Sequence, residues 1–212
     1  MEILSNFVVF EGLDGSGTTT QLNILETFFL QNTAPLSLPP LHKTFEPTDG
    51  YIGRLIRSSL KKEISFSPAT IAFLFAADRN EHLHAAGGIV ELCRSGKLVV
   101  SDRYAPSSLV YQGITCGEEL PWKLNQDFPG PELLLFFDID PETAQKRIAR
   151  RELREIYEQA DFQVKVQEHY KALLPMYEKE GVKVEIIDAS LPPEEVAGEV
   201  WSVIGKLPIF KG

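Results

Sequence analysis

Short apolar runs alternate with longer segments of helical spacing along this 212-residue chain. Five runs have the length and composition of strands: Phe7 to Glu11, Leu41 to Phe45, Leu98 to Ser101, Leu133 to Asp138 and Lys183 to Asp188. The segment after the first run places Leu22, Leu25 and Phe29 on one helical face. The alternation predicts right-handed βαβ crossovers, and hence an α/β fold whose parallel five-stranded sheet is flanked by helices.

Length and composition indicate one domain spanning residues 1–212. The chain is 43% hydrophobic and 24% charged, as in ordinary globular proteins, and it contains no internal repeat or long linker. No secretory signal pattern opens it and no apolar run reaches the length of a membrane span, so we expect a cytoplasmic protein without membrane contact. The net charge of −9 argues against a nucleic-acid partner, although it allows a local basic pocket.

Cysteine and histidine supply no metal or disulfide framework in the sequence. Cys93 and Cys116 are too few for a disulfide scaffold and lack the spacing of metal ligands. His82 and His84 have no matching ligands nearby, so we expect them to be solvated helix residues.

A glycine-rich turn between the first strand and the first helix has the spacing of a phosphate-binding loop. Such loops read Gly, four residues, Gly, Lys, then Ser or Thr. Gly12, Gly17 and Thr19 match this pattern, but Thr18 stands where the lysine is usual. A helix that begins here directs its positive end at a bound anion. The alternative is a strand-to-helix turn that binds no ligand.

Polar residues follow two other strands, where parallel sheets collect their ligands. Glu46 comes just after the second strand, and Asp102 and Arg103 end the third, where an acidic residue can hold Mg²⁺ or its waters. Phe75 and Arg79 are four residues apart on one helical face, where a ring suits a base and a guanidinium suits a phosphate. The alternatives are an ordinary turn at Glu46, a strand-capping Asp–Arg pair, and a core Phe beside a surface Arg.

These motifs, taken in order, resemble the thymidylate kinases over nearly the whole chain. The resemblance rests on Gly12 to Thr20, Glu46-Pro47, Phe75 with Arg79, Asp102-Arg103-Tyr104 and Ser107 to Gly113. It implies the three-layer fold of P-loop NTPases, transfer of the ATP γ-phosphoryl group to dTMP to give dTDP, and assembly as a homodimer.

The resemblance also implies a role for each matching residue. The donor ATP is expected on the loop residues Gly12, Gly15, Ser16, Gly17, Thr18, Thr19 and Thr20. The acceptor dTMP is expected on Asp14, Glu46, Arg57, Phe75, Arg79, Arg103, Ser108 and Gln112. In this scheme Phe75 stacks on thymine, and Arg57 and Arg103 hold the monophosphate. Mg²⁺ would be held by Thr19 and, through water, by Asp102.

An arginine-rich segment at about residues 144–158 resembles the lid of the same family. Because the loop has no lysine or arginine, the catalytic positive charge must come from elsewhere. The expected catalytic residues are Asp14, Arg103 and the lid arginines Arg147, Arg151 and Arg154. Arginines supplied to phosphoryl transfer in other P-loop enzymes give about three to five powers of ten in rate, enough to offset the missing lysine. The alternative for this segment is a solvated helix face.

Phe45 is a second departure from the family, which more often has a basic residue before Glu-Pro. Two other functions stay open at this point. One is a kinase for another nucleoside monophosphate such as dUMP, and the other is a nucleotide-binding protein that lost its chemistry together with the lysine. Neither the choice between ATP and GTP nor the oligomeric state can be read from the sequence.

Overall fold

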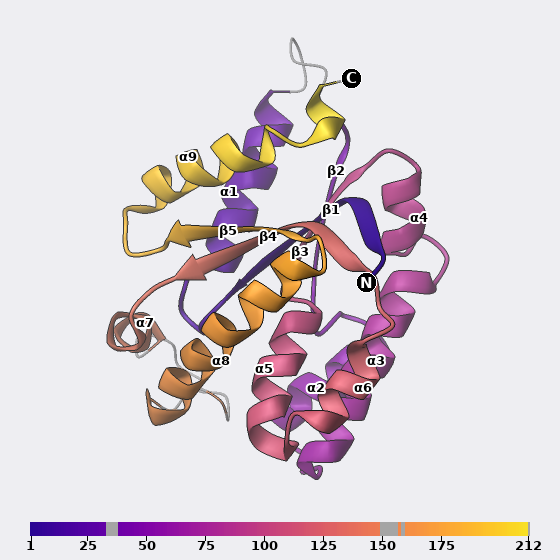
Figure 1. Ribbon diagram of the computed structural model, residues 1–212, viewed down its shortest axis with the longest axis vertical. Helices are drawn as coiled ribbons and strands as arrows, with labels where there is room; N and C mark the ends of the chain where they lie inside the picture. Colours follow the sequence, from indigo (N-terminus) through magenta and orange to yellow (C-terminus); the bar gives the residue numbers. More distant parts are fainter. Residues whose placement is uncertain (33–37, 149–156, 158–159, 212) are drawn as a thin grey trace.

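Five parallel strands form one sheet. The computed structural model describes residues 1–32, 38–148, 157 and 160–211. The strands are β1 (Ile3–Gly12), β2 (Leu41–Phe45), β3 (Leu98–Asp102), β4 (Gly130–Asp138) and β5 (Lys183–Asp188), in the spatial order β2-β3-β1-β4-β5 (Figure 1). The predicted α/β fold with a parallel five-stranded sheet is confirmed.

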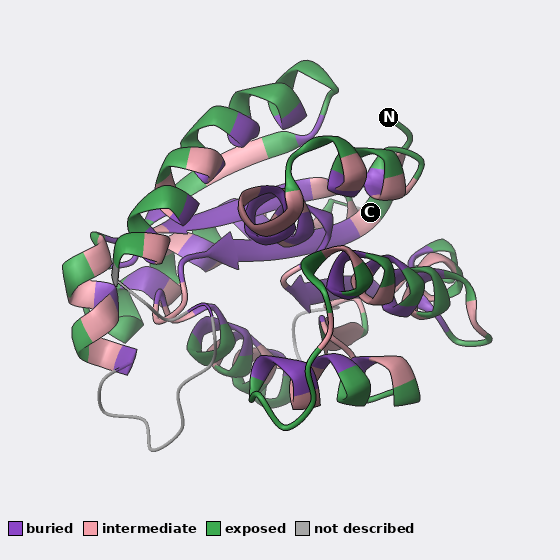
Figure 2. Cartoon of the chain, turned by 90° about the horizontal axis from the view of Figure 1, so that it is seen from below, coloured by how far each residue is buried: buried purple, intermediate pink, exposed green. Residues whose placement is uncertain are grey.

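Helices cover both faces of this sheet (Figures 1 and 2). They are α1 (Thr18–Gln31), α2 (Tyr51–Leu60), α3 (Pro68–His84), α4 (Ile89–Arg94), α5 (Ala105–Cys116), α6 (Glu119–Asn125), α7 (Pro141–Ile148), α8 (Ala160–Lys179) and α9 (Pro193–Ile204), with a 3₁₀ turn at Pro208–Phe210. Helices α1 and α9 pack together on one face, whereas α4, α5 and α8 lie on the other. Among the described residues no helix is both long and apolar enough for a membrane span.

The central strand β1 is buried on both faces. Phe7 and Val9 point into a cluster with Leu83 and Ile89, whereas Val8 and Phe10 point into the larger cluster that includes the apolar side of α1. Side chains alternate along a strand, so four consecutive apolar residues fill both layers. This burial fixes the carboxyl end of β1, from which the glycine-rich loop starts.

Strand β1 begins earlier than the apolar run predicted. It starts at Ile3 rather than Phe7, because Ile3 and Leu4 already pair with β4. The left-handed φ of 65° at Asn6 and a register shift between Leu4 and Val8 interrupt this pairing without ending the strand. The backbone N–H of Asn6 donates to the Glu132 carboxylate over 2.6 Å, and its side-chain amide donates to a backbone carbonyl. A polar interruption that looked like the start of the strand is therefore an irregularity within it.

Candidate active site

Three adjoining pockets lie at the carboxyl ends of the strands, two of them beyond β1, β2 and β3 and the third beyond β1, β4 and β5. The inner pocket is lined by Asp14, Glu46, Pro47, Leu60, Phe75, Arg79, Arg103, Tyr104, Ser107, Ser108, Tyr111, Gln112 and Tyr157. The central cleft is lined by the loop from Leu13 to Leu22 except Ser16 and Gln21, and by Asn23, Lys43, Phe45, Glu46, Pro47, Arg57, Asp102 and Arg103. The outer pocket is lined by Gly15, Ser16, Gly17, Thr20, Gln21, Arg147, Ala189, Leu191, Pro193 and Val196.

Glycines give the loop its shape. Gly15 and Gly17 have φ values of 86° and 96°, which side chains rarely adopt. A methyl group on Gly12 would lie 2.9 Å from the carbonyl oxygen of Phe137, and one on Gly15 would lie 2.6 Å from that of Ala144. The loop therefore packs directly on β4 and α7, while Gly17 opens α1 with free space beside it. A helix N-terminus in this position favours an anion.

Thr18 and Thr19 begin α1 with different surroundings. Thr18, which stands at the lysine position, is buried but lines the central cleft. The Thr19 hydroxyl donates to Asp102 Oδ2 over 2.5 Å. The second oxygen, Asp102 Oδ1, is buried and has no hydrogen-bond partner within the described part of the chain. A buried carboxylate oxygen without a partner, beside a hydroxyl, suits a divalent cation or its water.

Arg103 joins the loop to the inner pocket. Its guanidinium lies 2.6 Å from Asp14 Oδ1 and also donates to the Gly12 carbonyl and the Ser107 hydroxyl. Burial disfavours the charged form, but Tyr111, Asp14 and neighbouring groups raise the pKa of Arg103 well above its ordinary value. Arg103 is therefore a fixed cation shared by the inner pocket and the central cleft, and the alternative of an Asp102–Arg103 pair is wrong.

Asp14 is held from a second side by α8. The side-chain amide of Gln163 donates to Asp14 Oδ2 over 3.0 Å, and its oxygen accepts from the Asp14 backbone N–H over 3.2 Å. This reciprocal pair fixes the loop acid at the boundary between the inner pocket and the central cleft.

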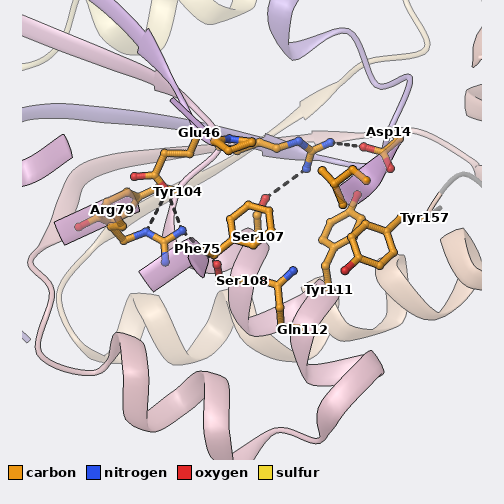
Figure 3. Close-up of a pocket in the computed structure, with 13 residues that line it drawn as sticks. Asp14, Glu46, Phe75, Arg79, Tyr104, Ser107, Ser108, Tyr111, Gln112 and Tyr157 are labelled. Carbon is orange, nitrogen blue, oxygen red and sulfur yellow. Dashed lines mark hydrogen bonds and ion pairs between the residues drawn. The ribbon is translucent and has the colours of Figure 1, made fainter. Parts of the chain in front are cut away.

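Glu46 and Arg79 form a buried ion pair at the base of the inner pocket (Figure 3). Nε and one terminal nitrogen of Arg79 lie 2.9 and 2.6 Å from Glu46 Oε2, and the guanidinium also donates to Ser108 and Asn125. Arg79 is only 1% exposed, so the alternative of a surface arginine is wrong. Because Glu46 binds Arg79 through this ion pair, the alternative of an ordinary turn at Glu46 does not account for the residue.

His82 differs from the sequence expectation. Its ring contacts Glu46 Oε1 and the Thr44 hydroxyl, and its side chain is 11% exposed, so the prediction of a solvated residue is wrong for His82. His84 is exposed, as predicted. Among the described residues no group of three His, Cys, Asp or Glu side chains is placed to hold a metal ion.

Helix α5 presents one polar face to the inner pocket (Figure 3). Ser108 and Gln112 are four residues apart and lie on the same side as Phe75 of α3, where a flat ring and several polar atoms converge. Tyr111 and Tyr157 close another side of the pocket, with ring centroids 5.4 Å apart. The predicted residues Phe75, Arg79, Ser108 and Gln112 thus line one cavity.

Arg57 reaches the central cleft from α2. Its guanidinium donates to the carbonyl oxygens of Pro47 and Thr48, each over 2.5 Å, and lies 2.7 Å from the exposed carboxylate of Asp49. The centroid of the Phe45 ring lies 5.9 Å from the guanidinium carbon. Backbone carbonyls of the loop after β2 thus orient this arginine of α2.

The predicted lid is described only in part. Arg147, on α7, lines the outer pocket beside the glycine-rich loop, so it lies on the α9 side of the loop and away from the inner pocket. Arg151 and Arg154 lie outside the described residues, as does most of the 144–158 segment.

Glu11 supports the site although sequence reasoning did not single it out. Its fully buried carboxylate accepts from the backbone N–H groups of Tyr104 and Ser107, the Ser107 hydroxyl and the Tyr170 hydroxyl. Burial raises the pKa of Glu11, and Arg103 and these donors offset the effect in part. Glu11 thereby ties the start of α5 to the end of β1.

Three residues of the site had no recognisable sequence signal: Asn125, Tyr157 and Gln163. Each lies far along the chain from the glycine-rich loop, so only the packing of helices brings Tyr157 to the inner pocket, Asn125 to Arg79 and Gln163 to Asp14. Ser107 was within a motif, and its contact with Arg103 could have been suspected from that position.

Comparison with known proteins shows which family this chain belongs to. A family model described as "Thymidylate kinase" matches residues 10–200. A protein of Treponema pallidum with a provisional thymidylate kinase name is 45% identical over 174 residues, covering 82% of this chain and 81% of that protein. "Probable thymidylate kinase" proteins of Pyrobaculum aerophilum and Methanococcus maripaludis are 40% and 37% identical, covering 97% of this chain and 99% and 98% of theirs.

Proposed function

Because the chain belongs to the thymidylate kinase family, we propose that it transfers the γ-phosphoryl group of ATP to dTMP, giving dTDP and ADP. One observation supports this proposal above the others. Asp14 and Arg103 line both the inner pocket and the central cleft, where the glycine-rich loop lies. A nucleoside monophosphate in the inner pocket would therefore direct its phosphate toward a donor on the loop.

The base of dTMP fits the inner pocket by its chemistry. Phe75 provides an aromatic face for a planar ring, and Arg79, Ser108 and Gln112 provide polar atoms for its edge. Glu46 already neutralises Arg79, so we assign Arg79 to the base edge rather than to the phosphate. A dianionic phosphate would instead meet Arg57 and Arg103, whose forks suit phosphate oxygens.

The donor fits the loop and the outer pocket. Backbone N–H groups from Gly12 to Thr20 would cradle the phosphates, and the outer pocket with Arg147 would take the adenosine. Thr19 and Asp102 fit Mg²⁺, because Asp102 Oδ1 is a buried oxygen without a partner among the described residues. Bound there, Mg²⁺ would neutralise charge on the β- and γ-phosphates.

Catalysis of the phosphoryl transfer requires that the two substrates are positioned and that positive charge lies near the transferring group. A dTMP phosphate oxygen attacks the γ-phosphorus in line, the bond to the β-γ bridging oxygen breaks, and ADP leaves. Arg103 is held by Asp14 and needs no rearrangement to face the transferring group. No strong general base is required, because the nucleophile is already an anionic oxygen. Arg151 and Arg154 are further proposed partners of the γ-phosphate.

Direct detection of dTDP tests this function. Purified protein is incubated with Mg²⁺, ATP and dTMP, with dUMP, dCMP and dGMP as alternative acceptors and GTP as an alternative donor. Selective formation of dTDP is expected. Binding of ATP and dTMP without product would favour a silent nucleotide-binding protein, and preference for dUMP would favour another nucleoside monophosphate kinase.

A homodimer is part of the proposal. Large apolar side chains are exposed on α2, on α3 and between them, at Tyr51, Leu55, Ile64 and Phe73. Such a surface suits a second copy of the chain. Light scattering should give the mass of a dimer, and Phe73→Asp should lower it to that of a monomer. A cytoplasmic location stays a prediction.

A further inference from the structure

The central cleft contains one lysine, although the glycine-rich loop has none. Among the described residues that line this cleft, the cations are Lys43, Arg57 and Arg103. Arg103 is bound to Asp14, and Arg57 is bound to the loop after β2. Lys43 has no part in the proposed function.

Lys43 points from the edge strand toward α1. It pairs with Val100 of β3, and Phe45, two residues later on the same face, pairs with Asp102. The Lys43 ammonium lies 2.9 Å from Asn23 Oδ1 and 2.5 Å from Glu26 Oε2, both on α1. The ammonium is therefore held against the helix that begins at the glycine-rich loop.

This contact lies one helical turn from the proposed metal ligand. Thr19 and Asn23 are four residues apart on α1, which separates them by about 6 Å along one face. Thr19 contacts Asp102, and Asn23 contacts Lys43. Lysine is a compact charge on a flexible stem with four carbons, so rotation of its side chain can move the ammonium toward the loop.

We propose that Lys43 provides the ammonium group that the loop lacks at Thr18 and binds phosphate oxygens in the central cleft. The proposal rests on the proposed kinase function. Glu26 is the resting partner: both side chains of the pair are more than 30% exposed, so the ion pair is weak and a phosphate dianion can displace the carboxylate.

The cleft would hold phosphates from two sources, the β- and γ-groups of ATP and the monophosphate of dTMP. In both cases Lys43 would contact anionic phosphate oxygens. A rise in the KM for ATP after removal of the ammonium would assign it to the donor, a rise in the KM for dTMP would assign it to the acceptor, and a fall in kcat alone would assign it to the transferring group.

The experiment compares Lys43→Met in two backgrounds. In the natural chain it should lower kcat/KM about 10²-fold, the lower end of the loss expected for one preorganised donor. In the Thr18→Lys variant the same change should cost less than about threefold, because the loop then has its own ammonium. Lys97→Met is the matched control: Lys97 is also half-buried, but it precedes β3 at the opposite end of the sheet and should leave kcat/KM unchanged.

Glu26→Gln separates phosphate binding from a structural ion pair. If the pair only fastened β2 to α1, Glu26→Gln would reduce activity as Lys43→Met does. If Lys43 binds phosphate, Glu26→Gln should have unchanged or higher activity, because the ammonium is released from its resting partner. Lys43→Arg should retain most of the activity of the natural chain. Equal losses from Lys43→Met in both backgrounds, or a change of less than twofold in the natural chain, would overturn the proposal.

Failure of the kinase function has a different result. If the natural chain forms no dTDP, the affinities of ATP and dTMP are measured by calorimetry instead. Weaker binding of either nucleotide to Lys43→Met than to Lys97→Met would then support the phosphate contact without turnover. Equal affinities would reject it.

Discussion

At the scale of single residues, Arg103 has an unusual backbone. Its φ is 72°, in the left-handed region, where a residue other than glycine costs about 1–2 kcal/mol. Its N–H donates to the Phe10 carbonyl over 2.9 Å, and its guanidinium is fixed by Asp14, the Gly12 carbonyl and Ser107. The surrounding contacts therefore hold a strained residue whose cation faces two pockets.

Arg103→Lys should reduce kcat/KM for dTMP about 10²- to 10³-fold. The charge is retained, but one compact ammonium does not reproduce the two separate nitrogens with which the guanidinium contacts Asp14 on one side and Gly12 and Ser107 on the other. Steady-state kinetics measures the loss, and Arg54→Lys serves as the control, because Arg54 is exposed over the ring of Tyr51. Equal activities of the two variants would show that charge alone suffices at residue 103.

The sequence predicted which residues line the same pocket better than it predicted the hydrogen-bond and ion-pair partner of each residue. Phe75, Arg79 and Gln112 follow from motif and helical spacing, and they do line one pocket. The charge of Arg79, however, is neutralised by Glu46, and Asp102 binds Thr19 rather than the adjacent arginine. Pairings of this kind depend on distances between separate elements, which no local pattern specifies.

At the scale of elements, the position of α5 depends on Glu11. Four donors from α5, its preceding turn and α8 converge on this carboxylate, and Ser107, Ser108 and Gln112 line the inner pocket from the same helix. A buried carboxylate at the end of β1 thus sets the position of the helix that faces the proposed base.

The burial of Glu11 predicts a particular pH dependence of stability. Burial raises its pKa above the ordinary value of 4.5, so the folded state retains a proton that the unfolded state has lost. The free energy of unfolding, relative to Glu11→Gln, should be highest below about pH 4.5 and fall as pH rises through the raised pKa. Urea denaturation of both proteins across pH measures this. A difference that is constant with pH would contradict the assignment.

The first turn of α2 depends on a close approach between backbones. A methyl group on Gly53 would lie 1.9 Å from the Thr48 carbonyl oxygen, which also accepts from Arg57. Gly53→Ala should therefore lower the free energy of unfolding by about 1–3 kcal/mol and raise the KM for dTMP. Gly198→Ala, in the middle of α9 with no described atom within 4 Å of the added methyl, should raise the free energy of unfolding by about 0.5–1 kcal/mol.

The predicted ends of strands agree with the structure where the amino-acid composition changes sharply. The limits of β2 and β5 match the predicted segments, because Pro40 and Glu46 border β2 and turns at Gly181 and Ser190 lie on either side of β5. The amino ends of β1 and β4 were placed too late, since both strands continue past a polar or proline residue in a register set by their partners. Strand pairing therefore extends elements beyond the limits that local composition indicates.

At the scale of the whole molecule, the sheet order would place both proposed substrates at one edge of the sheet. Strand β1 lies between β3 and β4, so the loop that follows it has the inner pocket on one side and the outer pocket on the other. The fold class and the glycine-rich loop predicted this edge of the sheet. They did not predict two residues from the chain beyond β4: Tyr157, which lines the inner pocket, and Gln163, which holds Asp14.

Because the acceptor site joins α2, α3, α5 and the loop after β2, dTMP should stabilise the whole fold. At a concentration one hundred times its Kd, the gain is about 2.7 kcal/mol, or roughly 5–11 °C in Tm for a chain of this size. Arg57→Gln should lose most of the shift with dTMP but retain the shift with ATP, since Arg57 is assigned to the acceptor phosphate. Thermal scans with each nucleotide measure both shifts. A full dTMP shift in Arg57→Gln would place the acceptor phosphate on other residues, and a lost ATP shift would move Arg57 to the donor.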